Sequence, residues 1–255
     1  MSFPQHPKKH REEALFTPRH FFRYLRSTGE AVPRAPSTFI LCYSRDLKKF
    51  AVEALHARQA KEAPEFILLT PERPLGFIQV GIGAPSLAMT IEELMARGAR
   101  RFVSVGFAGC LQPDLDVGTT VLCKRAIRDE GTSYHYTRAS KYAYPSGPLT
   151  ALLRRGLEAQ GVRVRTGASW TVDAVYRETR AEVQMYQAEG VLTVEMEASA
   201  LFSVARASGA EAAALFTISD ILDETGWVPR FVQAKEHLQS LLKQTVLALA
   251  TDRPC

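Results

Sequence analysis

The sequence predicts a three-layer α/β/α sandwich around a central mixed β-sheet. The first observation is alternation, because short apolar runs of strand length are repeatedly followed by longer segments with the spacing of amphipathic helices. The second is size, since 255 residues suit one α/β domain with a large core. The third is composition, with 46% hydrophobic and 23% charged residues, as in ordinary globular proteins. Strands that alternate with helices form layered α/β folds.

The first 36 residues differ from the rest and are predicted to be an N-terminal extension and linker, with the α/β domain over residues 37–255. Thr17 followed by Pro18 is typical of a helix start, which predicts a short helix over Pro18–Ser27. Gly and Pro residues between Thr28 and Pro36 then predict a linker.

The alternation begins after this linker. The predicted strands are Thr38–Cys42, Phe66–Leu69, Phe77–Val80, Phe102–Val105, Val121–Ile127, Val162–Trp170, Val191–Val194 and Ala212–Ile218. The predicted helices are Leu47–His56, Ser86–Arg97, Leu149–Gln160, Ala198–Ser208 and Phe231–Ala250. Pro85 lies just before the second of these helices, where a proline favours helix initiation.

Charge and hydropathy exclude several function classes. The net charge of +5 favours a solvated basic face and is compatible with anionic substrates, but no basic run is interleaved with aromatic residues as in nucleic-acid-binding proteins. No apolar run reaches the roughly 20 residues of a membrane span. Residues 1–13 are polar and basic without the apolar centre of a secretion signal, so we expect a cytoplasmic protein.

The cysteines carry no metal or disulfide pattern. Cys42, Cys110, Cys123 and Cys255 are widely spaced, which favours reduced and mostly buried thiols. The cysteine spacing therefore predicts no metal site.

Two acidic positions follow buried apolar runs. Glu197 comes shortly after the run Val191–Val194, and Asp220 lies 23 residues later, after Ala212–Ile218. With a helix between them, the two runs predict a β-α-β unit with both carboxylates at the carboxyl ends of parallel strands, where open α/β sheets bind ligands. The alternative is structural, because either side chain alone is typical of a residue that caps a helix.

These segments resemble the purine nucleoside phosphorylase and uridine phosphorylase family. In that family a Glu-Met-Glu segment contacts the ribose and a following Ser-Asp contacts the purine base, as Glu195-Met196-Glu197 and Ser219-Asp220 would here. The resemblance spans roughly residues 37–250 and is strongest to bacterial members with a long N-terminal extension. Further segments that carry it are Val80–Ser86, Val105–Gly109, Asp129–Ser133 and Trp170–Thr179. It implies a phosphorylase/hydrolase-like fold and cleavage of a nucleoside.

The resemblance implies a role for each residue. Glu197 would accept hydrogen bonds from the ribose 2′- and 3′-hydroxyls, and Met196 would lie against the sugar. Asp220, beside Ser219, would be the general acid that protonates purine N7. Trp170 and Tyr176 fall where the family builds its base pocket, although Trp170 is equally typical of a core aromatic residue.

Two positions bear on the base. Members of the family that select uracil carry Gln and Arg where this chain has Thr179 and Ala181, which argues against uracil recognition of the usual kind and for a purine.

The expected phosphate site departs from the family pattern. Relatives use Gly-Asp-Pro-x-Arg after the first strand, whereas this chain has Ser44, Arg45 and Lys48 in that segment. Relatives also carry Arg-x-Gly-Ser/Thr at the second glycine turn, where this chain has Ser104 and Phe107. Lysine lacks the bidentate geometry of arginine, and Arg45 is the candidate to compensate.

Three functions therefore remain open. Phosphorolysis of a ribonucleoside, with phosphate as co-substrate, gives free base and ribose 1-phosphate and would serve purine salvage. Hydrolysis is favoured by Gly106-Phe107-Ala108-Gly109, which matches the Gly-x-Ala-Gly of related nucleosidases. A non-catalytic nucleoside-binding protein is the third. The resemblance also implies a homo-oligomer, from dimer to hexamer, that needs no metal or organic cofactor. From charge and hydropathy we expect no nucleic-acid or membrane partner.

Overall fold

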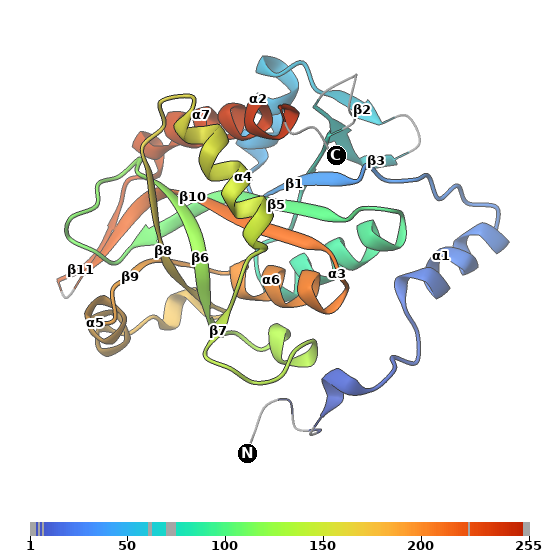
Figure 1. The fold of residues 1–255 in the computed structure, drawn as a ribbon, viewed down its shortest axis with the longest axis horizontal. Helices are drawn as coiled ribbons and strands as arrows, with labels where there is room; N and C mark the ends of the chain where they lie inside the picture. The colour runs from blue at the N-terminus through green and yellow to red at the C-terminus, as the bar shows by residue number, and fades with distance from the viewer. Residues whose placement is uncertain are drawn as a thin grey trace.

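The structure is a computed structural model that describes residues 4, 6, 8–60, 63–69, 75–223 and 225–251 (Figure 1). Its strands are β1 (Thr38–Cys42), β2 (Arg58–Ala60), β3 (Ala63–Leu68), β4 (Leu75–Gln79), β5 (Arg101–Cys110), β6 (Thr120–Asp129), β7 (Tyr142–Ala143), β8 (Val164–Val172), β9 (Val191–Glu195), β10 (Glu211–Asp223) and β11 (Gly226–Pro229). Its α-helices are α1 (Pro18–Ser27), α2 (Arg45–Ala54), α3 (Ala84–Ala96), α4 (Gly147–Glu158), α5 (Arg180–Ala188), α6 (Ala198–Ala207) and α7 (Phe231–Ala250). Three short 3₁₀ helices are η1 (Lys9–Arg11), η2 (Thr132–His135) and η3 (Val175–Arg177).

The predicted three-layer α/β/α sandwich is confirmed. Helices α3 and α6 cover one face of the mixed sheet, and α2, α4 and α7 cover the other (Figure 1). Each face has its own apolar cluster, and a third cluster lies beneath α5, around Trp170 and Tyr186. Burial of apolar side chains on both faces is what stabilises such a sheet.

Five strands of the sheet close into a ring. They follow one another in the order β10, β6, β8, β9 and β5, and β10 also pairs with β5. The ring corrects the predicted β-α-β unit, because β10 runs parallel to β5 whereas β9 runs antiparallel to it. The physical reason is the length of β5, whose first eight residues pair with β10 and whose last two pair with both β10 and β9. The two acidic segments therefore meet at the end of β5 from opposite directions.

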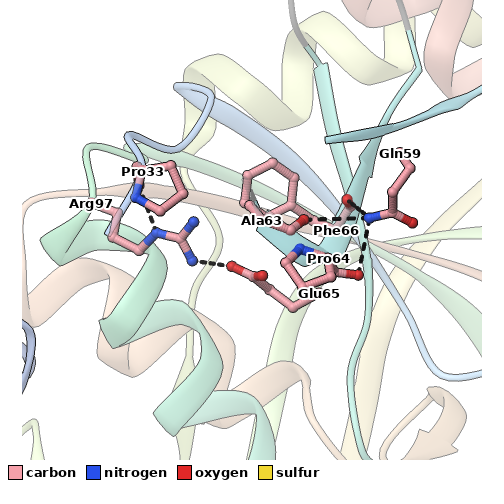
Figure 2. A network of polar contacts seen from close by, with 7 residues as sticks. All are labelled: Pro33, Gln59, Ala63, Pro64, Glu65, Phe66 and Arg97. Atoms are coloured by element: carbon pink, nitrogen blue, oxygen red, sulfur yellow. Dashed lines mark hydrogen bonds and ion pairs between the residues drawn. The ribbon is translucent and has the colours of Figure 1, made fainter. Parts of the chain in front are cut away.

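The N-terminal extension contacts the sheet domain through a buried arginine. Arg97, just after α3, donates from Nε to the carbonyl oxygen of Pro33 at 2.9 Å. Its guanidinium also pairs with Glu65 and lies 5.3 Å from the ring centroid of Phe66 (Figure 2). The backbone N–H of Ala35 adds a bond to the Arg97 carbonyl oxygen at 2.9 Å. Because that side chain is 8% exposed, these bonds secure the linker against the end of α3.

The predicted helices and long strands are present, with ends that differ by a few residues. The sequence did not predict α5 or the short strands β2, β7 and β11, which lie at sheet edges or in hairpins. A signal for α5 was available, because Thr179 and Glu182 form a capping box and this spacing is visible in the sequence. None of the described helices has the length and apolar content needed to cross a bilayer.

Candidate functional site

The first acidic residue of the Glu-Met-Glu segment organises the turn after β9. Glu195 is buried, and its Oε1 accepts hydrogen bonds from Thr171 Oγ1 at 2.6 Å and Ser169 Oγ at 3.2 Å. Its Oε2 accepts the backbone N–H groups of Glu197 at 2.8 Å and Ala198 at 2.7 Å. Four donors occupy this carboxylate, so it fixes the backbone at the start of α6 and presents the following residues.

The second acidic residue lies against the first glycine turn. Glu197 is 7% exposed, and its Oε1 accepts the backbone N–H of Gly83 at 2.6 Å. Gly83 has φ +101°, a left-handed conformation that a residue with a Cβ adopts only under strain. Burial, reinforced by the charge of Glu195, raises the pKa of Glu197 to about 8. The half-buried Met196 lies between the two carboxylates in the chain.

Gly109 is where the two acidic segments meet. Its backbone pairs with Val194 of β9 on one side and with Asp220 of β10 on the other. A Cβ at this position would lie 3.0 Å from Val194 Cγ1 and 3.1 Å from Asp220 Oδ2, and closer still to Leu222. A side chain at this position would therefore displace neighbouring side chains of β9 and β10, whereas glycine leaves them in place.

The second segment does not end its strand as predicted. Strand β10 continues to Asp223, and its register shifts between Ile218 and Asp220, which leaves Ser219 in a bulge. A bulge changes the direction of the side chains that follow it. It places the 8% exposed Asp220 beside Ser219, whose Oγ lies 2.5 Å from Asp220 Oδ1.

Two residues that the sequence did not single out surround Asp220. The indole Nε1–H of Trp227, on β11, donates to Asp220 Oδ2 at 2.8 Å. Glu178, between η3 and α5, also faces it, and burial followed by the charge of Asp220 raises the pKa of Glu178 to about 7. The site therefore contains two acidic groups and one indole donor, an arrangement suited to proton transfer.

The two residues expected in the base pocket have different surroundings. Trp170 is fully buried, packs against Tyr186 with ring centroids 4.7 Å apart, and donates from Nε1 to Asp129 Oδ2 at 2.9 Å. This is the core position that was the alternative for Trp170. Tyr176 is on η3 and is 96% exposed.

The residues expected to bind phosphate form two groups. Ser44, Arg45 and Lys48 lie together at the start of α2, where Ser44 Oγ accepts the backbone N–H of Leu47 at 3.3 Å and so acts as the helix cap. The buried hydroxyl of Ser104 lies 3.0 Å from that of Tyr43, which precedes Ser44.

The Phe107 side chain lies apart from Ser104. It contacts the opposite apolar cluster, and its ring packs edge-on against Phe231 with centroids 5.8 Å apart. Together with Ser44 and Lys235 it lines a cavity of about 290 Å³ between α2 and α7.

The described cysteines carry free thiols. Cys42, Cys110 and Cys123 are free and buried, whereas Cys255 lies outside the described residues. Within the ranges that the structure describes, no three His, Cys, Asp or Glu side chains are arranged to hold a metal ion.

Comparison with known proteins extends this description. The chain is 33% identical to a guanosine phosphorylase of Halorubrum lacusprofundi over 56% of this chain and 60% of that protein. It is 33% identical to a uridine phosphorylase of Treponema pallidum over 61% of this chain and 66% of that one. A Bacillus cereus DeoD-type purine nucleoside phosphorylase is 31% identical over 55% and 60% of the two chains. These alignments span less than two thirds of each relative.

The fold comparison covers more of the chain. The crystal structure of uridine phosphorylase from Vibrio fischeri superposes with a TM-score of 0.72 at 25% identity, over 86% of this chain and 93% of that one. The family model of the phosphorylase superfamily matches residues 46–250, a segment that includes the glycine turns, the Glu-Met-Glu segment and Asp220. The chain belongs to the phosphorylase superfamily.

Proposed function

We propose that the protein is a nucleoside phosphorylase that cleaves the N-glycosidic bond of a ribonucleoside, with a preference for purines. Phosphate is the co-substrate, and the products are free base and ribose 1-phosphate. This proposal rests on one observation, that the segments containing Glu197 and Asp220 meet at Gly109. Named relatives that act on guanosine, uridine and purine nucleosides support the reaction class.

The chemistry of the bond explains why two acids are useful. Its cleavage passes through an oxocarbenium-like state, with positive charge on the sugar and negative charge on the departing base. Glu197, already oriented by Gly83, would accept hydrogen bonds from the ribose hydroxyl groups, and Met196 would contact the sugar. Asp220 would donate a proton to the base, with Ser219 beside it. Phosphate would then attack the sugar carbon.

A purine preference is supported by the start of α5. The side chain of Thr179, at the position where uracil-selecting members carry Gln, lies 2.6 Å from Glu182 and accepts the Glu182 backbone N–H at 3.3 Å. A residue committed to capping a helix is poorly placed to read a base edge. Base recognition would then fall to Ser219 and Asp220.

Phosphate would bind near the start of α2. Arg45 and Lys48 supply positive charge beside a helix N-terminus, where anions are stabilised. We expect Lys48→Ala to raise the KM for phosphate by about tenfold while the KM for nucleoside changes less than about twofold. The matched control is Lys49→Ala, because Lys49 is 72% exposed and pairs with Glu53 on the surface. Equal phosphate KM values for the two variants would contradict this placement.

The second candidate function is hydrolysis. It is favoured by the second glycine turn, where the Ser104 hydroxyl is paired with Tyr43 and the Phe107 ring packs on Phe231, so neither side chain replaces a phosphate-binding arginine. A water molecule would then attack the sugar carbon, and ribose would be the second product.

One assay distinguishes these functions. Base release is measured from inosine, guanosine, adenosine, uridine and methylthioadenosine, with and without phosphate, and the sugar product is identified. Release that requires phosphate and yields ribose 1-phosphate supports the proposal, whereas phosphate-independent release of ribose identifies a nucleosidase. Nucleoside binding without base release from any substrate indicates the non-catalytic protein.

We also propose that the active form is a homo-oligomer. Ile82, in the first glycine turn, and Met89, on α3, are 68% and 60% exposed in the single chain. Apolar side chains so exposed next to a site are typical of a subunit interface. Light scattering after size-exclusion chromatography would give the number of subunits, and a monomer at working concentration would contradict the proposal.

A further inference from the structure

In the hydrogen bond between Trp227 and Asp220, the indole is the donor and the carboxylate is the acceptor. Strand β11 pairs antiparallel with β10, and the register sets Trp227 opposite Leu222. The turn between the strands is held by Asp223 Oδ1, which accepts the backbone N–H groups of Thr225 at 2.7 Å and Gly226 at 3.1 Å. The indole Nε1–H reaches Asp220 Oδ2 at 2.8 Å while the Trp227 side chain stays 59% exposed. The hairpin thus delivers one donor to one carboxylate oxygen.

An indole nitrogen can only donate a hydrogen bond. With the Trp227 N–H directed at it, Oδ2 of Asp220 must be an acceptor, so a proton on this carboxyl group is directed to Oδ1. We propose that Trp227 is a positioning residue, whose N–H keeps Oδ2 unprotonated and makes Oδ1 the oxygen that transfers the proton to the base. This inference rests on the nucleoside-cleaving function proposed above.

Ser219 completes the arrangement on the other oxygen. Its hydroxyl lies 2.5 Å from Asp220 Oδ1 and 3.4 Å from the carbonyl oxygen of Ala108. When Asp220 is ionised, the Ser219 O–H donates to Oδ1. When Oδ1 carries the proton, that proton is directed to the base, and the Ser219 O–H turns to the Ala108 carbonyl oxygen.

The proposed proton transfer breaks one bond and forms one. The O–H bond at Oδ1 breaks, an N–H bond forms on the departing base, and Asp220 is left as a carboxylate. Trp227 keeps its bond to Oδ2 throughout, so it contacts the acid without exchanging a proton.

Two other titratable groups in the described part of the chain interact electrostatically with Asp220. Glu178 approaches from the segment before α5, with a pKa raised to about 7 by burial and then by Asp220, and the Cys110 thiol approaches from β5. Among the described residues, a pH effect at Trp227 therefore has to be assigned between Asp220 and these two neighbours. The variants Glu178→Gln and Asp220→Asn make that assignment.

The first test does not depend on activity. The chain has two tryptophans, so its ¹H–¹⁵N spectrum has two indole N–H signals, which the variants Trp170→Phe and Trp227→Phe assign. We expect the Trp227 signal to shift with pH in the wild-type protein, to shift still in Glu178→Gln, and to stop shifting in Asp220→Asn. The Trp170 signal, whose indole bonds to Asp129, is the internal control, because Asp220→Asn should leave its pH dependence unchanged. A Trp227 signal that ignores pH, or that follows Glu178, would overturn the inference.

The second test is kinetic. Trp227→Phe keeps an aromatic ring and removes only the donor, so kcat is expected to fall about 10- to 100-fold while KM changes less than about threefold. Without the donor the carboxylate form is less stabilised, and the alkaline limb of the kcat profile should move to higher pH. Trp170→Phe, the matched variant, should leave that limb in place.

The outcomes separate the two proposals. If wild-type protein turns over nucleosides and Trp227→Phe has the same kcat and pH profile, the role of Trp227 is refuted and the proposed function stands. If wild-type protein releases no base, the proposed function fails, and the indole signals still decide whether Trp227 reports on Asp220.

Discussion

Two tryptophan–aspartate pairs in this molecule make the same hydrogen bond in opposite surroundings. In the first, the indole of Trp170 is fully buried and donates at 2.9 Å to Asp129 at the exposed end of β6. In the second, the indole of Trp227 is 59% exposed and donates at 2.8 Å to the buried Asp220. The buried partner is the donor in one pair and the carboxylate in the other.

The difference shows what each bond is for. A buried polar atom without a partner costs free energy, whereas a solvent-exposed one is satisfied by water. Asp129 therefore serves Trp170, a core residue packed on Tyr186, and that pair stabilises the fold. Trp227 serves Asp220, so the second pair keeps a carboxylate usable inside the protein.

The largest expected difference is between the two aspartates. We expect Asp220→Asn to lower kcat for 6-oxopurine nucleosides by about 10²- to 10⁴-fold, because a general acid is lost, while nucleoside binding is retained. Asp129→Asn, the matched change in the other pair, should keep kcat within about threefold, since an amide oxygen still accepts from Trp170. Steady-state kinetics and nucleoside titration measure both. Similar kcat values for the two variants would remove Asp220 as the acid.

The next largest difference is in the free energy of unfolding. Here the first pair, that of Trp170, should show the larger effect. Trp170→Phe leaves a smaller ring in a fully buried position, and we expect a loss of about 2–3 kcal/mol in the free energy of unfolding. Trp227→Phe changes an exposed side chain and should cost less than about 1 kcal/mol. Urea unfolding followed by circular dichroism measures both. If Trp227→Phe were the more destabilising change, its bond to Asp220 would be structural.

The sequence predicted the layers of the fold and the position of the candidate site, but neither tryptophan–aspartate bond. Alternating apolar and helical segments were sufficient to place the layers and the helices of the sandwich, and the spacing of Glu197 and Asp220 located the candidate site. Trp170 was recognised as either a base contact or a core residue, because an aromatic residue in a buried strand is typical of both. Its burial could be decided only once α5 was placed over it.

The contacts of Asp220 could not be predicted. Its bond to Trp227 depends on a short hairpin and on a bulge at Ser219, neither of which has a periodic sequence pattern. Its proximity to Glu178 joins segments 42 residues apart in the chain. The ring of five strands is likewise set by pairing between distant segments, and local propensity does not encode such pairing.

The smallest expected effect extends the comparison to the two glutamates. Glu195 accepts from four donors and serves the fold, whereas Glu197 accepts from Gly83 and has a pKa raised from 4.5 to about 8 by burial and by Glu195. Between these two pH values the unfolded chain loses the Glu197 proton and the folded chain keeps it. The contribution of Glu197 to stability therefore falls as pH rises from about 4.5 to about 8.

A neutral side chain at position 197 removes this decrease of stability with rising pH. Between pH 4.5 and pH 8, the free energy of unfolding of Glu197→Gln should increase relative to that of the wild-type protein by on the order of 1 kcal/mol. Urea unfolding of both proteins across this pH range measures the difference. The same variant should bind nucleoside more weakly at pH 8, because an amide cannot accept from two ribose hydroxyls as a carboxylate does. A stability difference that stays constant with pH would mean that Glu197 has the same pKa in the folded and unfolded chains. Stability gained together with binding lost identifies a buried carboxylate that is retained for its ligand and not for the fold.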